Sequence, residues 1–223
     1  MWEFIDKIVY INLDSRQDRR DIMTKFFREK NVPMEKVIRF SAIQQKSGAL
    51  GCLKSHTAVL SMAKQNNWNN VLILEDDLQW INFDSAYRQL EEYVRKPDWN
   101  VIMLTGWYRE YSFPRIYSSY NTGAYLVKNS YYDTLLANRN YAVYMRSKAL
   151  FFQPKVPHDA DVSWDHCMKT GVWYGLYPCI ISQVDGPSDN SKGIIKASLA
   201  VGIYSLEVRR QIWGHENGLL RIV

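Results

Sequence analysis

The sequence predicts an α/β protein with a largely parallel sheet, because short apolar segments alternate with segments of helical periodicity. Apolar and β-branched residues fill 7–13 and 71–74, and polar residues follow each of these segments. Apolar side chains recur at helical spacing between them. In the first half we expect strands at 7–13, 37–42, 71–74 and 101–104, and helices at 16–30, 49–66 and 83–95.

The first helix is expected to bury Ile22, Phe26 and Phe27, with Asp14 or Ser15 as its N-cap. The second half of the chain is less regular. There we expect strands at 122–127 and within 174–182, helices at 130–138, 161–169 and 199–210, an aromatic, loop-like segment at 141–157 and a turn-rich loop at 185–190. No internal repeat or low-complexity linker divides the sequence, so a single domain over 1–223 is predicted.

Composition is that of a globular domain: 223 residues, of which 47% are hydrophobic and 23% charged. The three cysteines, Cys52, Cys167 and Cys179, are scattered and form no C-x-x-C pair. This spacing indicates neither a disulfide framework nor a structural zinc site, and buried thiols are expected.

The net charge of +5 suits an anionic partner, or simply a soluble, basic surface. No apolar run approaches the ~20 residues that cross a bilayer, and the first residues lack a signal-peptide layout. A cytoplasmic protein is therefore expected. A C-terminal helix with Arg209 and Arg210 suggests either peripheral contact with the inner membrane face or a solvated surface.

Three consecutive carboxylates, Glu75-Asp76-Asp77, follow the apolar strand at 71–74. Burying unpaired acids at a strand end is costly, and a Mg²⁺ or Mn²⁺ ion would offset that cost and bridge to a diphosphate. The alternative is that these acids cap the next helix in solvent. The motif thus predicts a metal site or a helix start.

A second polar cluster, with Asn12, Asp14, Arg16 and Arg19, joins the first strand to the first helix. A strand end followed by a helix N-terminus is an anion-binding geometry. Asn12 would read a base edge, and an arginine would pair with phosphate or stack on the base. The competing interpretation is an ordinary charged first turn with Asp–Arg pairs.

Two further sets of residues are candidates for a functional site. His56 on the second helix is either a structural residue or a contact to donor or acceptor hydroxyls. Asp161 and Asp165 are four residues apart, on one helix face, where a carboxylate could accept a proton from an acceptor hydroxyl. They could equally be capping or surface acids. Gly-rich phosphate loops, the G-x-S-x-G elbow and H-E-x-x-H are all absent from the sequence.

In order along the chain, these segments resemble glycosyltransferase family 25, the lipooligosaccharide biosynthesis transferases and collagen hydroxylysine galactosyltransferases. The resemblance spans about residues 7–190, leaving 191–223 as a C-terminal appendage. The similar segments are Tyr10–Arg20, Gly48–His56, Leu72–Asp77, Thr122–Val127, Trp164-Asp165, Tyr177–Gln183 and Ser188-Asp189.

The resemblance implies a GT-A fold, a single Rossmann-like domain that binds a UDP-hexose with Mn²⁺ or Mg²⁺. It implies inverting transfer of galactose or glucose to an oligosaccharide, or to hydroxylysine of a collagen-like protein. Asn12, Asp14, Arg16, Arg19, His56, Glu75 and Asp76 would then line the donor site. Asp77 with Glu75 would bind the metal, and Asp165, with Asp161 in reserve, would be the base.

Three alternatives remain open at this point. A catalytically inactive glycan-binding protein would keep the fold without turnover. A basic nucleic-acid-binding module would use the positive charge and the aromatic side chains, although the Lys and Arg residues are spread along the chain. A metal-dependent nucleotidyl or phosphoryl transferase would also use acids at a strand end.

Overall fold

The computed structural model describes residues 2–81, 83–152, 162–184, 186–187, 194–195 and 202–203. Within these residues a nine-stranded sheet has the order β13-β6-β7-β9-β5-β8-β3-β1-β2. Its strands are β1 (Lys7–Asn12), β2 (Val37–Ser41), β3 (Asn70–Glu75), β5 (Val101–Met103), β6 (Trp107–Ser112), β7 (Arg115–Tyr120), β8 (Ala124–Lys128), β9 (Trp173–Gly175) and β13 (Gly202–Ile203). Two small sheets pair β4 (Leu78–Trp80) with β10 (Ile181–Gln183), and β11 (Gly186–Pro187) with β12 (Ile194–Ile195).

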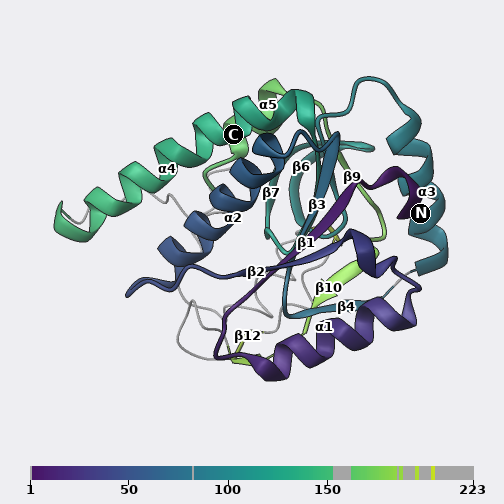
Figure 1. Ribbon diagram of the computed structural model, residues 1–223. Helices are drawn as coiled ribbons and strands as arrows, with labels where there is room; N and C mark the ends of the chain where they lie inside the picture. The colour runs from purple at the N-terminus through teal and green to yellow at the C-terminus, as the bar shows by residue number, and fades with distance from the viewer. Residues whose placement is uncertain are drawn as a thin grey trace.

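Helices cover both faces of the large sheet (Figure 1). The α-helices are α1 (Gln17–Glu29), α2 (Gly48–Gln65), α3 (Phe83–Arg95), α4 (Tyr132–Phe152) and α5 (Asp165–Thr170), and short 3-10 helices are η1 (Trp2–Phe4), η2 (Met34–Lys36) and η3 (Asn129–Tyr131). No α-helix in the described ranges combines the length and hydropathy needed to cross a membrane.

Alternation along the strands divides the core into two layers. On β3, Leu72 and Leu74 pack with α1 and α3, whereas Val71 and Ile73 pack with α2 and α4. Successive strand residues point to opposite faces of a sheet, so each apolar strand supplies both cores at once. This explains why the strand at 71–74 is apolar throughout.

The predicted α/β class is confirmed, and the sheet is mixed. β1 pairs in parallel with β2 and β3, whereas β8 lies antiparallel between β3 and β5. A hairpin of β6 and β7, not expected from the sequence, continues the sheet beyond β9. The parallel part, β2-β1-β3, brings the carboxyl ends of β1 and β3 to one edge, where such sheets bind ligands.

Several local predictions were wrong. α1 begins without a side-chain N-cap at Arg16, and it buries Met23 in place of the exposed Ile22. α4 continues through Phe152, so 141–152, predicted as loop-like, is helical. Residues 202–203, predicted as helix, form β13. Residues 153–161 and most of 185–210 lie outside the described residues.

Candidate functional site

The acidic motif lies at the sheet edge where β1 and β3 end side by side. Ile11 on β1 is in register with Glu75 on β3, so Asn12 lies beside Asp76. The alternation that sends Val71 and Ile73 toward α2 also sends Glu75 to that face. Asp76 consequently lies on the α1 face. The first two acids of the motif therefore have different surroundings.

On the α1 face, Asn12 is fully buried and connects three elements. Its Nδ2 donates to Asp76 Oδ2 at 2.7 Å and to the Arg16 carbonyl at 3.1 Å. Its Oδ1 accepts from Arg39 Nε at 2.9 Å. Arg19 Nη1 lies 2.8 Å from Asp76 Oδ1 and 3.5 Å from Asp77 Oδ2. Asp76 is thus held by Asn12 and Arg19 together.

Replacing Asn12 by Ala is expected to lower the free energy of unfolding by about 1–3 kcal/mol, because it strips a hydrogen bond from the buried Asp76 carboxylate. Urea unfolding of both proteins measures the change. Asp14→Asn is the control: Asp14 is exposed, and its loss should have a much smaller effect. Equal effects of the two substitutions would contradict a structural role for the Asn12 network.

The other polar residues between β1 and α1, Asp14 and Arg16, lie around the N-terminus of α1. Asp14 pairs with Arg39 and accepts from Ser41 Oγ at 2.8 Å, and the Arg39 hydrogen bond, followed by that of Ser41, lowers the Asp14 pKa. Arg16 is held by Asp18 at 2.8 Å. Arg39 was absent from the predicted set. Its signal was a charged residue inside the otherwise largely apolar strand 37–42.

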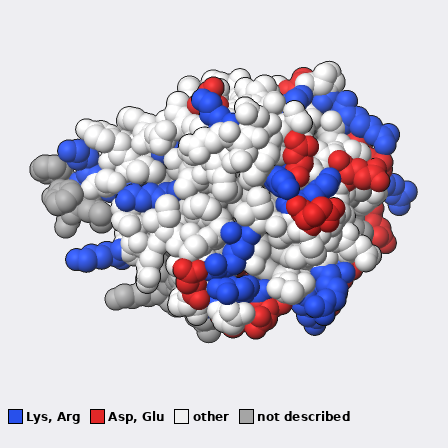
Figure 2. Space-filling model, viewed as in Figure 1, with Lys and Arg blue, Asp and Glu red and all other residues white. Residues whose placement is uncertain are grey.

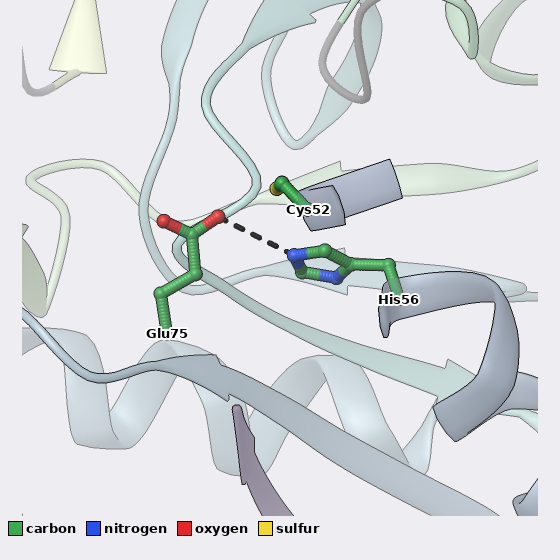
Figure 3. A group of neighbouring side chains, drawn as sticks. All are labelled: Cys52, His56 and Glu75. Carbon is green, nitrogen blue, oxygen red and sulfur yellow. Dashed lines mark ion pairs between the residues drawn. The ribbon is translucent and has the colours of Figure 1, made fainter. Parts of the chain in front are cut away.

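On the α2 face, Glu75 contacts three side chains from other elements. Thr122 Oγ1 donates to Oε1 at 2.5 Å, and Gln183 Nε2 donates to Oε2 at 3.0 Å. His56 Nε2 lies 3.4 Å from Oε1, and Figure 3 shows this ring directed at the carboxylate from α2. Tyr125 Oη lies 2.9 Å from the other ring nitrogen, Nδ1. His56 therefore bridges β8 and the acidic motif.

Burial lowers the pKa of His56, although the nearby Glu75 carboxylate opposes this shift. Burial by itself would raise the pKa of Glu75, but the contacts with His56 and Thr122 outweigh it and leave this pKa lowered. Burial therefore disfavours the charged imidazole, whereas the contacts of Glu75 favour its ionised form. The sequence alone is compatible with His56 as a structural residue or as a contact to substrate hydroxyls. In the structure its ring contacts Glu75 of the acidic motif.

Gln183 joins Glu75 to the last acid of the motif. Its Nε2 also approaches Asp77 Oδ1 at 3.4 Å, and Asn121 Nδ2 donates to its Oε1 at 3.0 Å. Asn121 adopts a φ of 81°, and its Oδ1 accepts from the Gly123 amide at 2.6 Å. The left-handed conformation suits Asn, which tolerates it better than most residues. This turn fixes which end of the Gln183 amide faces the acids.

Asp77, the last acid of the motif, has a strongly raised pKa. Burial, followed by the negative charge of Glu75, raises the Asp77 pKa to about 7, while Arg19 opposes the shift. Glu75 and Asp76 thus both add negative charge beside Asp77, and among the described residues Arg19 is the arginine that contacts Asp76 and Asp77. Such a cluster favours a bound cation, because a positive ion would stabilise the ionised form of every acid in it.

Asp165, the first residue of α5, lies against β7. Ser118 Oγ donates to Asp165 Oδ2 at 2.9 Å, and Arg109 Nη1 lies 3.8 Å from the same oxygen. Asp165 Oδ1 is buried and makes no hydrogen bond within the described part of the chain. Burial raises the pKa of this carboxyl group, while Ser118 and Arg109 lower it. Asp161, Ser188 and Asp189 lie outside the described residues.

The structure therefore brings together Asn12, Arg19, His56 and the three acids, with Asp14 and Arg16 at the rim. The predicted site residues did not include Arg39, Asn121, Thr122, Tyr125 and Gln183, which reach the site from other segments of the chain. On the face shown in Figure 2, basic and acidic side chains intermingle, without one continuous basic stripe. That distribution offers no support for the nucleic-acid-binding alternative.

Comparison with known proteins gives one family and several similar folds. Residues 46–153 match the sequence model of glycosyltransferase family 25 (LPS biosynthesis protein). No curated protein is significantly similar to the chain.

Among solved structures, A197 from STIV is similar over 85% of this chain and 93% of its own, with 12% identity and a TM-score of 0.49. The glycosyltransferase involved in glycosylation of the major capsid of PBCV-1 is similar over 75% and 92%, with 9% identity and a TM-score of 0.40. GlyE of Streptococcus pneumoniae TIGR4 is similar over 77% and 45%, with 10% identity and a TM-score of 0.44.

Proposed function

We propose that this chain, whose residues 46–153 match glycosyltransferase family 25, transfers galactose or glucose from a UDP-sugar to an acceptor hydroxyl, with inversion. The family match supports glycosyltransferase activity as such. The observation that carries the donor proposal is the acidic motif Glu75-Asp76-Asp77 at the end of β3, beside Asn12 at the end of β1. This edge of the sheet is where α/β proteins bind nucleotides.

The residues present fit a hard divalent cation, Mn²⁺ or Mg²⁺. Glu75 Oε2 and Asp77 Oδ1 both lie near the same Gln183 amide nitrogen, so the two carboxylate oxygens are close together, and an ion between them would replace that amide contact. Oxygen ligands are what these ions prefer. We propose that Asp77, helped by Glu75, holds the ion, which when bound would neutralise charge on the leaving diphosphate.

The donor side is proposed to lie between the end of β1 and the start of α1. Asn12 and Asp14 are fixed there by Arg39, and Arg16 lies next to the helix N-terminus. Backbone N–H groups at a helix N-terminus favour an anion, here the diphosphate. Arg19 positions Asp76 and Asp77 and thereby shapes the acidic end of this site.

Asp165 is the proposed general base. Its buried Oδ1 has no hydrogen-bond partner in the described residues, and its raised pKa favours proton acceptance closer to neutral pH. The acceptor is proposed to be an oligosaccharide of the lipooligosaccharide class, because the matching family is described as LPS biosynthesis proteins. Hydroxylysine of a collagen-like protein is the second acceptor to test.

UDP is expected to raise the melting temperature of the wild-type protein in Mn²⁺ and not in EDTA, because bound ligand stabilises the folded state by mass action. At 100 times the dissociation constant the gain is about 2.7 kcal/mol. Asp77→Ala should lose the Mn²⁺-dependent shift. Asp133→Ala, which removes an exposed acid paired with Lys64, is the matched control and should keep it. A UDP shift that survives EDTA, or survives Asp77→Ala, would contradict the metal assignment.

A further inference from the structure

A second group of ligand atoms lies on the opposite side of Glu75 from Gln183. Cys52 and His56 are four residues apart on α2, so both side chains lie on the same face of the helix. The thiol of Cys52, a ring nitrogen of His56 and a carboxylate oxygen of Glu75 all lie within 4.8 Å of one another. Figure 3 shows the three side chains converging from α2 and the end of β3.

His56 provides a second, independent observation. Its side chain is fully buried, and its Nε2 makes no hydrogen bond within the described residues, although it lies 3.4 Å from Glu75 Oε1. The other ring nitrogen, Nδ1, is engaged by the Tyr125 hydroxyl at 2.9 Å. A buried imidazole with one nitrogen held by a polar partner and the other directed into a ligand cluster is the usual arrangement of a metal-bound histidine.

We propose that Cys52, His56 and Glu75 form a binding site for Zn²⁺. Sulfur, nitrogen and carboxylate oxygen are the three ligand types that zinc takes in proteins, and three protein ligands leave its fourth position open. Thiolate and imidazole ligands disfavour Mg²⁺ and Mn²⁺. Zinc bond lengths of about 2.0–2.3 Å would require the three side chains to close by roughly 1 Å.

This site shares Glu75 with the hard-cation site proposed above, but it does not rest on the proposed function. Its carboxylate contact is through Glu75 Oε1, which faces His56, whereas Oε2 faces Gln183 and Asp77. Because one side chain would serve both sites, zinc would fix the orientation of Glu75 at the edge of the acidic motif. Cys52 is partly exposed, whereas His56 is fully buried.

The test is titration of chelator-treated, full-length protein with Zn²⁺ alone in a competition assay with a chromophoric chelator. One equivalent of Zn²⁺ is expected to bind. Cys52→Ser should weaken binding by more than about 100-fold, since even the loss of outer-shell partners costs about 10–100-fold. Cys167→Ala, which removes a buried thiol on α5, is the matched control and should bind Zn²⁺ like the wild type.

Co²⁺ serves as a spectroscopic probe of the ligands. Wild-type protein should show a thiolate-to-cobalt charge-transfer band that Cys52→Ser abolishes and Asp77→Ala retains. Cys52→Ser should also keep the Mn²⁺-dependent UDP shift, which separates this proposal from the proposed function. Zinc affinity unchanged in Cys52→Ser, or a cobalt complex without the charge-transfer band, would overturn the site.

Discussion

Asp165→Asn is expected to lower turnover by about 10²–10⁴-fold, the usual contribution of a general base. Asparagine has nearly the same shape as aspartate, and its amide oxygen could still accept the Ser118 hydrogen bond, so the fold should be retained. UDP binding in Mn²⁺ should be unchanged, because Asp165 is held by β7 and not by the acidic motif. UDP release from a UDP-hexose in the presence of an acceptor oligosaccharide measures the loss.

The dependence of kcat/KM on pH distinguishes a general base from a residue with only a structural role, because a structural role of Asp165 would not change the shape of this profile. If Asp165 is the base, wild-type kcat/KM should fall at acidic pH as this carboxylate is protonated. Asp165→Asn should lose that acidic limb. Asp161→Asn is the comparison variant and should keep both turnover and the limb. Loss of turnover in Asp161→Asn, with activity retained in Asp165→Asn, would transfer the role to Asp161.

The sequence predicted the framework of this site because its signals are local. Four apolar residues before Glu75-Asp76-Asp77 define a buried strand and its end. The strand at 7–13 ends likewise at Asn12, and parallel pairing then brings the two ends together. The pairing of β1 with β3 joins segments far apart in the chain, but it follows from the general preference for α/β topology.

The partners of the acids were not predictable in the same way. Thr122, Gln183 and Tyr125 reach Glu75 or His56 across about 47 to 108 residues of chain, and their own segments carry no charge pattern. The α4 extension was missed because the aromatic residues of 141–152 were taken as the main signal, although Ala142, Met145 and Lys148 in the same segment favour a helix, which packs against α2. The antiparallel direction of β8 was not predictable either, because its sequence has the pattern of an ordinary apolar strand and carries no sign of strand direction.

Metal-free Asp77→Asn is expected to be more stable than the wild type above pH 7, even though it removes a residue of the proposed metal site. Burial and the charge of Glu75 raise the Asp77 pKa to about 7 in the folded protein, well above the value of an unfolded chain. Between about pH 4 and 7 the folded state therefore binds more protons than the unfolded state. Stability of the wild type should fall as pH rises through this window and level off above it.

The penalty above pH 7 is roughly 4 kcal/mol at most, at about 1.4 kcal/mol per pKa unit. Asparagine carries no charge to bury, so in EDTA the variant should show a flatter pH dependence. Adding Mn²⁺ should reverse the order, because the ion stabilises the wild type by mass action and Asp77→Asn lacks the ligand. Urea unfolding measures the free energy of unfolding of both proteins at pH 5 and pH 8, each in EDTA and in Mn²⁺.

Asp76→Asn is the matched control for this experiment. Asp76 is hydrogen-bonded by Asn12 and paired with Arg19, so removing its charge should destabilise the protein with or without the ion. Opposite effects of the two neighbouring substitutions in EDTA would show that the motif contains one satisfied acid and one acid that requires a cation. If Asp77→Asn were less stable than the wild type in EDTA at pH 8, protein contacts alone would satisfy Asp77, and the electrostatic argument for a metal at this strand end would fail.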